Sequence, residues 1–399
     1  MSQYIVIGLG YVGINLFNSL QKKYSKVIGY DIDGEKINQL NSGIDPSNEI
    51  RNFKLVNKSL CTDDLDNQIN LNLKTIFFIC VPTPLKGSKP DLSIFEKAIL
   101  KISKFKLHNP FIIVNESSVY PGQTESITYK VFSKKKMTRN VNYSLSFSPE
   151  RINPGDNKNN FNNINKIVAS DNTVTLNKIT KIYKSITKGK IIKSKSIFEA
   201  EASKLIENTQ RDINIAFMNE MEAIFKSSYG NINNILSLAN TKWNFCNFKP
   251  GYVGGHCIAV DPYYLIEYAK KNNRDFSFIK KAREINDDKI KSVNRQILNY
   301  VNLKKKKFYN ILIVGITYKP NVPDLRESQS IKLYKLLDKK NHFKIFFYDT
   351  LISNYNGINS INVNTKKKFD IIINMSIHDN MKKNLVFIKK LLFKDHLTI

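Results

Sequence analysis

Residues 4–13 read Tyr4-Ile5-Val6-Ile7-Gly8-Leu9-Gly10-Tyr11-Val12-Gly13. This apolar run, which ends in three spaced glycines, predicts a strand, a tight turn and the start of a helix. In such a turn the first glycine permits the bend and the second lets a pyrophosphate approach the backbone. The third allows the helix to pack closely on the strand, with its N-terminus facing the anion. The stretch therefore indicates a Rossmann-type, dinucleotide-binding start to the chain.

A carboxylate follows where a dinucleotide-binding fold would use one. The next apolar run, at residues 26–30, ends at Asp31. In this fold an acid at the end of the second strand meets the ribose hydroxyls. It favours NAD over NADP, because it would repel the 2′-phosphate. The alternative is a Rossmann turn that binds no nucleotide.

Alternating strand and helix signals continue through the first 195 residues. Strand-like runs occur at residues 75–81 and 111–115, and residues 91–103 are compatible with a helix. Strands that alternate with helices predict a parallel, doubly wound sheet. We therefore expect residues 1–195 to form an NAD-binding Rossmann domain.

The pattern changes after residue 195. Residues 198–239 form a long helical stretch with apolar positions every three or four residues, and a four-lysine run at residues 304–307 reads as a linker. Beyond it, apolar runs at residues 311–315, 344–349 and 370–374 repeat the strand-first pattern of the N-terminus. The predicted fold class is α/β, with two Rossmann-like doubly wound parallel sheets joined by a central helical domain with a long helix. We expect this central domain at residues 196–300 and the second Rossmann-like domain at residues 305–399.

The charge of the chain allows two interpretations. The 399 residues include 62 basic and 34 acidic ones, which gives a formal net charge of +28. Such a charge can indicate a polyanion partner, or a basic surface that helps to hold a small anionic substrate. The basic residues are spread in short runs, without a recognition helix or an aromatic-interleaved module. We favour the second interpretation and expect no nucleic-acid partner.

The sequence also predicts a cytoplasmic protein. No run of 18 or more apolar residues appears, so we expect no membrane partner. The N-terminus reads as the first strand of a domain and not as a signal peptide. Four cysteines at unpatterned spacings suggest neither a disulfide framework nor a metal site, and they fit a reducing compartment.

One thiol stands in a loop suited to nucleophilic chemistry. Residues 254–257 read Gly-Gly-His-Cys, and Asp261 follows shortly after Cys257. The glycines leave the thiol accessible, and His256 and a cation such as Lys204 would raise its nucleophilicity. Together with a dinucleotide motif, this indicates an oxidoreductase in which a cysteine traps an aldehyde for a second oxidation. The alternative is a cysteine buried in a glycine-rich turn.

Other polar residues could assist this chemistry. Lys204 and Asn208 are four residues apart and so share one helix face, from which an ammonium and an amide can stabilise an oxyanion. Hydroxyls after residue 115 could orient a water, and Glu150 could activate one as general base. Taken singly, each feature could also be an ordinary solvated side chain or a surface turn.

Read together, these segments resemble the UDP-glucose/GDP-mannose dehydrogenase family. In family order the motifs are GLGYVG, VPTP, ESSVYPG, SPERINPGD, EASKLIENTQRDINIAFMNE, TKWNF, PGYVGGHCIAVDPYYL and GITYKPNVPDLRES, which lie between residues 8 and 328. TKWNF, SPERINPGD and GGHC with DPYYL most resemble the branch that acts on UDP-N-acetylhexosamines in Vi-type capsule and O-antigen synthesis.

The resemblance implies a four-electron oxidation of a sugar C6 alcohol to a carboxylate, with two NAD+ consumed. It implies that Cys257 carries first a thiohemiacetal and then a thioester. Lys204 and Asn208 would hold the C6 oxygen, and Asp261 would help with proton transfer. Glu150 would assist thioester hydrolysis. Family members are cytoplasmic dimers built on the central helices, so we expect a homodimer.

The resemblance also assigns binding residues. Those expected to hold NAD are Gly8, Gly10, Tyr11, Val12, Gly13, Asp31, Lys36, Pro82, Thr83, Ser118 and Arg326. Those expected to hold the UDP-sugar are Glu150, Arg151, Lys204, Asn208, Tyr252, Gly254 and Lys319.

The sequence departs from the family pattern at three places. Ser118 stands where many members have threonine, so the hydroxyl that positions water is kept. Pro154 stands four residues after Glu150, where the UDP-glucose branch has a second glutamate, and this supports the N-acetylhexosamine assignment. The sequence stops at Ile399, near the start of the family's final strand, so we expect a shortened C-terminal domain.

We therefore expect an NAD-dependent 6-dehydrogenase of UDP-GlcNAc or UDP-GalNAc that makes a uronic acid for surface polysaccharide. Within enzymes, the alternatives are a UDP-glucose or a UDP-ManNAc 6-dehydrogenase. From another class, the alternative is a non-catalytic sugar-nucleotide binder. The complete set of expected catalytic residues argues against a decaying scaffold.

Overall fold

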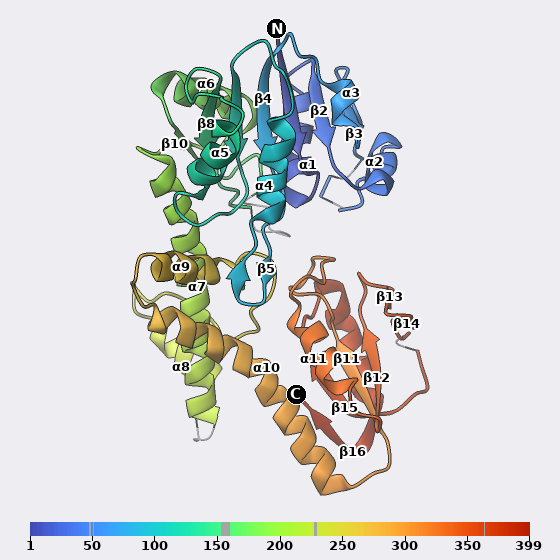
Figure 1. The fold of residues 1–399 in the computed structure, drawn as a ribbon. Coiled ribbons are helices and arrows are strands. Elements are labelled where there is room, and N and C mark those ends of the chain that lie inside the picture. The colour runs from blue at the N-terminus through green and yellow to red at the C-terminus, as the bar shows by residue number, and fades with distance from the viewer. Residues whose placement is uncertain (48, 51, 153–159, 227–229, 363) are drawn as a thin grey trace. The chain divides into compact units, whose positions relative to one another are not determined.

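The structure, a computed structural model, describes residues 1–47, 49–50, 52–152, 160–226, 230–362 and 364–399 (Figure 1). These residues form two compact units. The first unit comprises residues 1–207 and 263–272, and the second comprises residues 208–262 and 273–399. The division falls within two helices, α7 (Ile197–Lys226) and α9 (Asp261–Lys271).

A largely parallel sheet forms the centre of the first unit. Its strands are β1 (Ser2–Ile7), β2 (Val27–Tyr30), β3 (Leu60–Thr62), β4 (Lys74–Ile79), β7 (Phe111–Asn115), β8 (Tyr143–Phe147), β9 (Lys166–Ser170) and β10 (Ile191–Lys193). Within the described part of the chain they lie in the order β10-β9-β8-β7-β4-β1-β2-β3. Neighbours are parallel, except that β8 and β9 are antiparallel. A separate hairpin consists of β5 (Leu85–Lys86) and β6 (Lys89–Pro90).

Helices cover both faces of this sheet (Figure 1). They are α1 (Tyr11–Gln21), α2 (Gly34–Asn41), α3 (Leu65–Gln68), α4 (Ser93–Ile102), α5 (Gln123–Ser133) and α6 (Thr173–Ile186). Alternate side chains of β1 enter different cores, with Tyr4 and Val6 in one and Ile5 and Ile7 in the other. Helices α1, α2 and α6 contribute to the first core, and α4 and α5 contribute to the second. Burial on both sides is why these strands read as continuous apolar runs.

The second unit combines helices with a smaller sheet. Its helices are part of α7, α8 (Ile232–Ala239), α10 (Ser277–Lys304), α11 (Gln329–Leu337), the 3-10 helix η1 (Asp379–Asn384) and α12 (Leu385–Lys390). Its strands are β11 (Tyr309–Val314), β12 (Phe343–Tyr348), β13 (Asn354–Tyr355), β14 (Ile358–Asn359), β15 (Phe369–Asn374) and β16 (Leu392–Thr398). The parallel sheet has the order β12-β11-β15-β16, and β13 and β14 form a hairpin.

A buried ion pair joins α7 to α10 in the second unit. The Arg283 guanidinium contacts the Asp212 carboxylate at 2.6 Å, and both side chains are almost fully buried. Asn286 donates to the same carboxylate oxygen at 2.8 Å, and Asn219 donates to Asn286 at 2.9 Å. Breaking one partner of such a pair is costly, because the other charge is then buried without compensation.

The predicted fold class is confirmed, with two Rossmann-like sheets and a central helical part that contains a long helix. The helical stretch expected at residues 198–239 consists of α7 and α8. The domain boundaries expected at residues 195 and 305 stay predictions, as does the shortening of the last domain. That domain includes α12 and β16, which pairs with β15.

In the first unit, hydrogen bonds to the buried carboxylate of Glu201 link α7 to the start of α5. Glu201 accepts hydrogen bonds from the backbone N–H of Gly122 at 2.5 Å and of Thr124 at 3.0 Å. Gly122 precedes α5 with a φ of 88°, and its position has no side-chain cap of its own. Glu201 therefore satisfies donors that a helix N-terminus leaves open. Burial raises the pKa of the Glu201 carboxyl to about 7.

We expect the stability advantage of the wild type over Glu201→Gln to shrink as the pH rises from about 4.5 to about 7. The raised pKa means that the folded state binds this proton more tightly than the unfolded state does, so stability is lost as the proton leaves. The full shift corresponds to about 3 kcal/mol. Urea unfolding of both proteins at about pH 5 and about pH 8 measures it. An advantage that grows with pH would contradict the assignment.

Candidate functional site

The loop between β1 and α1 has the shape of a dinucleotide-binding turn. Gly8 has a φ of 91°, which an L side chain rarely adopts. A Cβ atom at Gly13 would lie 1.8 Å from the backbone oxygen of Gly8, so only glycine fits there. A Cβ atom at Gly10 would meet nothing within 4 Å, and Gly10 precedes α1 without a side-chain cap. The open space and the N–H groups at the start of α1 fit a pyrophosphate.

Asp31 lies beside this turn. Its Oδ2 accepts the Leu9 N–H at 2.8 Å and the Lys36 ammonium at 2.9 Å, and its Oδ1 accepts the Asp33 N–H at 3.1 Å. Asp31 is buried, whereas the Lys36 side chain is partly exposed. The expected cofactor residues Asp31 and Lys36 are thus in direct contact. The carboxylate is fixed at the carboxyl edge of β2, where ribose hydroxyls bind in this fold.

The loops after β4 and β7 contact each other at the same edge of the sheet. The Ser117 hydroxyl donates to the Val81 carbonyl at 2.8 Å. The Thr83 carbonyl accepts the hydroxyl of Tyr264, which lies in the α9 part of this unit, at 2.6 Å. Pro82 is exposed and Ser118 is half-buried. Ser118 therefore lies in the loop that follows the carboxyl end of β7 and keeps part of its surface exposed.

Glu150 and Arg151 occupy fixed positions after β8. Glu150 is buried, and its Oε1 accepts the N–H groups of Arg151 and Ile152, both at 2.6 Å. The Arg151 guanidinium contacts the Glu207 carboxylate at 2.8 Å. Lys204 lies one turn earlier on α7 and is also buried. Pro154, which the sequence marked as a departure from the family, lies outside the described residues.

In the second unit the structure brings together Asn208, Asp261 and Cys257. The Asn208 amide donates to Asp261 Oδ2 at 2.5 Å. The backbone N–H of Asp261 donates to the Cys257 carbonyl at 2.8 Å, so the carboxylate at the start of α9 is tied to the cysteine loop. Asp261 is buried and Cys257 is half-buried. An amide, a carboxylate and a half-buried thiol on connected segments are residue types suited to an oxidation site.

The cysteine loop packs against the loop that follows β11. Gly255 has a φ of 80°, and a Cβ atom there would lie 2.7 Å from the Tyr318 ring. A Cβ atom at Gly254 would lie 2.7 Å from the Glu327 carbonyl oxygen. The Gln329 amide donates to the Val253 carbonyl at 2.7 Å. Both glycines are therefore required by close packing, and the thiol loop is held against residues 318–329 of the same unit.

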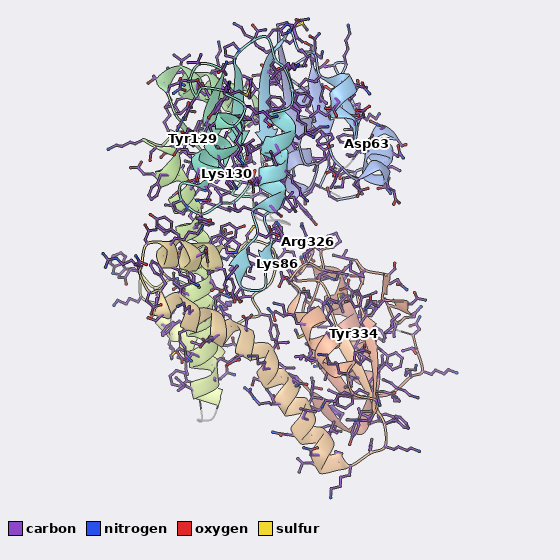
Figure 2. The ribbon with its side chains drawn as sticks, in the orientation of Figure 1. Asp63, Lys86, Tyr129, Lys130, Arg326 and Tyr334 are labelled. Carbon is purple, nitrogen blue, oxygen red and sulfur yellow. The ribbon has the colours of Figure 1, made fainter. Side chains whose placement is uncertain are left out.

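Lys319 and Arg326 lie in this loop. The backbone oxygen of Lys319 accepts the Thr317 hydroxyl at 2.9 Å. Arg326 forms an ion pair with Asp324 at 2.7 Å and keeps half of its side chain exposed (Figure 2). Arg326 belongs to the second unit, whereas the glycine turn belongs to the first. Its expected contact with NAD stays a prediction.

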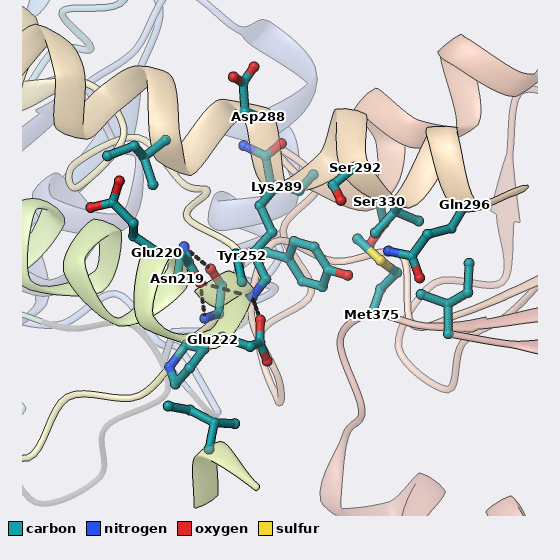
Figure 3. Close-up of a pocket in the computed structure, with 18 of the residues that line it drawn as sticks. Asn219, Glu220, Glu222, Tyr252, Asp288, Lys289, Ser292, Gln296, Ser330 and Met375 are labelled. Carbon is teal, nitrogen blue, oxygen red and sulfur yellow. Dashed lines mark hydrogen bonds and ion pairs between the residues drawn. The ribbon is translucent and has the colours of Figure 1, made fainter. Parts of the chain in front are cut away.

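A cavity of about 1120 Å³ lies in the second unit (Figure 3). Residues of α7 and α10 and of the carboxyl ends of β11, β15 and β16 line it, together with Tyr252. Lys289 reaches into it and donates to Glu222 at 2.5 Å and to Asn219 at 2.9 Å. Acidic and basic side chains both line the cavity, so its charge alone does not select an anionic ligand.

Among the described residues there is neither a metal-binding cluster nor a membrane-spanning helix. No group of three or more histidines, cysteines, aspartates or glutamates is placed to hold a metal ion. No helix in the described ranges is both long and apolar enough to cross a membrane. Of the other cysteines, Cys61 and Cys80 are buried and Cys246 is exposed. Burial raises the pKa of the Cys61 thiol to about 12, which makes it a poor nucleophile.

Sequence reasoning missed the partners of several predicted residues. Lys166, which contacts Glu150, reads in the sequence as one of many lysines. Glu201, which fastens α7, reads as a solvated helix residue. The only available signal was a lysine at the first position of an apolar strand, Lys166-Ile167-Val168-Ala169, where a charge is rarely buried without a partner.

Family models match three parts of the chain. Their descriptions are UDP-glucose/GDP-mannose dehydrogenase family, NAD binding domain (residues 2–187), central domain (residues 198–288) and UDP binding domain (residues 312–399). The chain is 35% identical over 396 residues to Protein CapL of Staphylococcus aureus, covering 95% of this chain and 90% of that protein.

Two further relatives have names that specify a sugar. The UDP-N-acetyl-D-glucosamine 6-dehydrogenase of Pseudomonas aeruginosa is 35% identical over 387 residues, which cover 94% of this chain and 90% of that protein. The solved structure of the UDP-D-ManNAc dehydrogenase of Pyrococcus horikoshii superposes with a TM-score of 0.87 at 29% identity, covering 99% of this chain and 94% of that one.

We expect Gly13→Ala to destabilise the first unit, and Gly10→Ala to leave it folded but weaken NAD binding. The Cβ atom at residue 13 collides with backbone, whereas the one at residue 10 enters the space expected for the pyrophosphate. The first change should lower the free energy of unfolding by about 1–3 kcal/mol. Thermal unfolding and NAD titration of both variants separate the two effects. Equal melting temperatures for the two variants would show that the turn tolerates a side chain at residue 13.

We expect Gly255→Ala to lower kcat strongly and stability by about 1–3 kcal/mol, because it needs both a positive φ and a displaced Tyr318 ring. Gly251→Ala is the matched control, because a Cβ atom there would meet nothing within 4 Å and its φ is not positive. Steady-state kinetics and urea unfolding measure both quantities. Wild-type kcat in the Gly255→Ala protein would mean that the loop does not depend on this packing.

Proposed function

The chain belongs to the UDP-glucose/GDP-mannose dehydrogenase family, and we propose that it oxidises the C6 alcohol of a UDP-N-acetylhexosamine to the carboxylate. It is an NAD-dependent UDP-sugar dehydrogenase. The observation that carries the proposed chemistry is the set of Asn208, Asp261 and Cys257 within one unit. The backbone of the cysteine loop is hydrogen-bonded to Asp261, whose carboxylate accepts the Asn208 amide, and a two-step oxidation through a covalent intermediate requires a thiol, an amide and a carboxylate of this kind.

The first unit supplies the cofactor site. The glycine turn, the uncapped start of α1 and the Asp31 carboxylate fit the pyrophosphate and the adenosine ribose. When bound, NAD+ accepts a hydride from the sugar carbon in each of the two oxidations. Lys36 already pairs with Asp31 and would stay beside the ribose. Pro82, Thr83 and Ser118 belong to loops at the same carboxyl edge, so we assign them to the nicotinamide end.

In the first oxidation the sugar C6 hydroxyl loses a proton and its carbon loses a hydride. We assign Lys204 and Asn208 to the C6 oxygen, where an ammonium and an amide stabilise developing negative charge. We assign Asp261, whose carboxylate accepts the Asn208 amide at 2.5 Å, to accept the proton. These assignments are supported by the burial of Lys204 and Asp261, which strengthens electrostatic interactions with a bound oxygen.

In the second oxidation Cys257 carries the substrate. Its thiolate adds to the C6 aldehyde to form a thiohemiacetal, and loss of a second hydride gives a thioester. Water then attacks the thioester carbon, Glu150 takes a proton from that water, and the carbon–sulfur bond breaks to restore the thiolate. Ser118 would orient the water. The half-buried position of Cys257 supports this role, because the sulfur must meet a substrate.

The nucleotide and the sugar define the substrate. Lys319 would contact the UDP phosphates, and Arg151, Tyr252 and Gly254 would line the sugar nucleotide. Pro154 in place of a second glutamate supports an N-acetylhexosamine over glucose. UDP-GlcNAc and UDP-GalNAc are the proposed substrates, and the product would be a uronic acid for surface polysaccharide. UDP-ManNAc remains a second candidate, because a relative of high structural similarity carries that name.

We also propose that the enzyme is a cytoplasmic homodimer. Within the second unit, α7 and α8 expose Phe217, Ile224 and Leu238 by half or more of their surface, and Trp243 is almost fully exposed. Large exposed apolar side chains on neighbouring helices are typical of a surface that a second subunit covers. A reducing compartment would keep the Cys257 thiol free.

The proposal predicts two NADH per sugar oxidised. Wild-type protein is incubated with NAD+ and, separately, UDP-GlcNAc, UDP-GalNAc, UDP-ManNAc and UDP-glucose, and NADH and remaining sugar are quantified. We expect Cys257→Ser to lower kcat on the order of 1,000-fold, because no thioester can form. The exposed Cys246→Ser is the control and should keep wild-type kcat.

The UDP-sugars that the protein oxidises distinguish the proposed function from its alternatives. Turnover of UDP-ManNAc or UDP-glucose alone would replace the proposed sugar and keep the mechanism. NAD binding without turnover of any UDP-sugar would reject the enzymatic proposal in favour of a sugar-nucleotide binder.

A further inference from the structure

A fully buried lysine stands behind Glu150 in the first unit. Lys166 opens β9 with no exposed surface. Its ammonium contacts Glu116 Oε2 at 2.8 Å and Glu150 Oε2 at 3.3 Å. Burial alone would lower the pKa of Lys166, but the two carboxylates outweigh burial and raise it. The lysine is therefore charged, and its charge is held between two acids.

The second acid has a partner of its own. Glu116 follows β7 directly, is buried, and accepts the hydroxyl of Tyr183 from α6. Burial raises the pKa of Glu116, and the Lys166 ammonium partly offsets this effect. The rings of Tyr183 and Phe161 lie 5.2 and 5.5 Å from the ammonium and close the site around it. Residues from four separate segments thus enclose one cation.

This cation determines the position of the Glu150 carboxylate. The backbone N–H groups of Arg151 and Ile152 hold Oε1, and Lys166 contacts Oε2. Glu150 is 9% exposed, whereas Lys166 has no exposed surface. Lys166 therefore cannot meet a substrate, and any effect it has on chemistry must act through Glu150.

We propose that Lys166, held in place by Glu116 and Tyr183, is a positioning residue that orients the Glu150 carboxylate for thioester hydrolysis. This inference rests on the proposed function. In the step concerned, water adds to the thioester carbon, its proton passes to Glu150, and Cys257 leaves as the thiolate. The step involves no oxidant or reductant, so a defect in it must spare both hydride transfers.

Rapid-mixing kinetics can measure the hydrolysis step separately from the two oxidation steps. Lys166→Met removes the charge at similar length, and Lys166→Arg keeps a cation. In rapid-mixing experiments with NAD+ and the best UDP-sugar, we expect Lys166→Met to give a burst of about two NADH per active site. Its steady-state rate should be on the order of 10- to 100-fold lower than that of the wild type.

Two further readouts distinguish positioning from a general loss of structure. In Lys166→Met the acyl adduct on Cys257 should accumulate in mass spectrometry of the quenched protein. The value of kcat/KM for the UDP-sugar should stay near that of the wild type, because hydrolysis follows both hydride transfers. Lys166→Arg should restore most of the rate and prevent accumulation of the adduct. The control Lys101→Met breaks the ion pair with Asp66 in the same unit and should change neither readout.

If Lys166→Met fails to fold, Glu116→Gln provides a second test. It keeps the cation but removes the carboxylate that holds the ammonium at 2.8 Å, so the burst should persist while the steady-state rate falls. Burst and steady-state rates that fall together, or a slow steady state with no adduct on Cys257, would overturn the inference while the wild type still turns over. Absence of NADH from the wild type with every UDP-sugar would instead reject the proposed function.

Discussion

A buried carboxylate that accepts hydrogen bonds from backbone N–H groups is the interaction on which the functional loops of this chain depend. Asp31 accepts the Leu9 N–H of the glycine turn, and Glu150 accepts two N–H groups of the loop that follows it. Asp349 accepts the Ile316 N–H in the second sheet. Loops that leave strand ends have N–H groups without ladder partners, and leaving such groups unsatisfied costs about 1–3 kcal/mol each. The acids therefore define loop shape before any ligand binds.

The two Rossmann-like sheets have a similar glycine turn after β1 and after β11, but the aspartate that accepts the turn's N–H has different partners in each. Gly8 and Gly315 both have a positive φ, and each is followed by an N–H that an aspartate accepts. In the first half Asp31 also accepts the Asp33 N–H and contacts Lys36, whose side chain is partly exposed. In the second half Asp349 also contacts His378, and both are buried. Both carboxylates are buried, but the charged partner of the first is partly exposed whereas the histidine partner of the second is buried.

The sequence predicted the strands that are continuous apolar runs, such as Ile311–Val314, because such runs are typical of strands buried on both faces. It did not predict β3, β9, β10 or β16. Motif spacing also singled out Asp31 and Cys257. Asp31 ends the strand that follows the glycine turn, and Cys257 follows a pair of glycines. Motif spacing could not locate Lys166 or Glu201, because a single buried charge leaves no periodic pattern and its partners are far away in the chain. The antiparallel pairing of β9 was missed for the same reason, as pairing direction depends on the path of the connection and not on local composition.

Because many acidic side chains are buried in hydrogen bonds and ion pairs, the solvent-exposed surface carries more positive charge. Among the described residues the buried acids are Asp31, Asp45, Glu116, Glu150, Glu201, Asp212, Asp261, Asp324, Asp349 and Asp370, whereas the buried bases are Lys166, Lys204 and Arg283. The solvent-facing shell is therefore more positive than the net charge of +28 indicates. Such a shell acts as a polycation that attracts doubly charged nucleotides over a Debye length of about 10 Å at 0.1 M salt. Dilute buffer accelerates these encounters, and concentrated salt slows them.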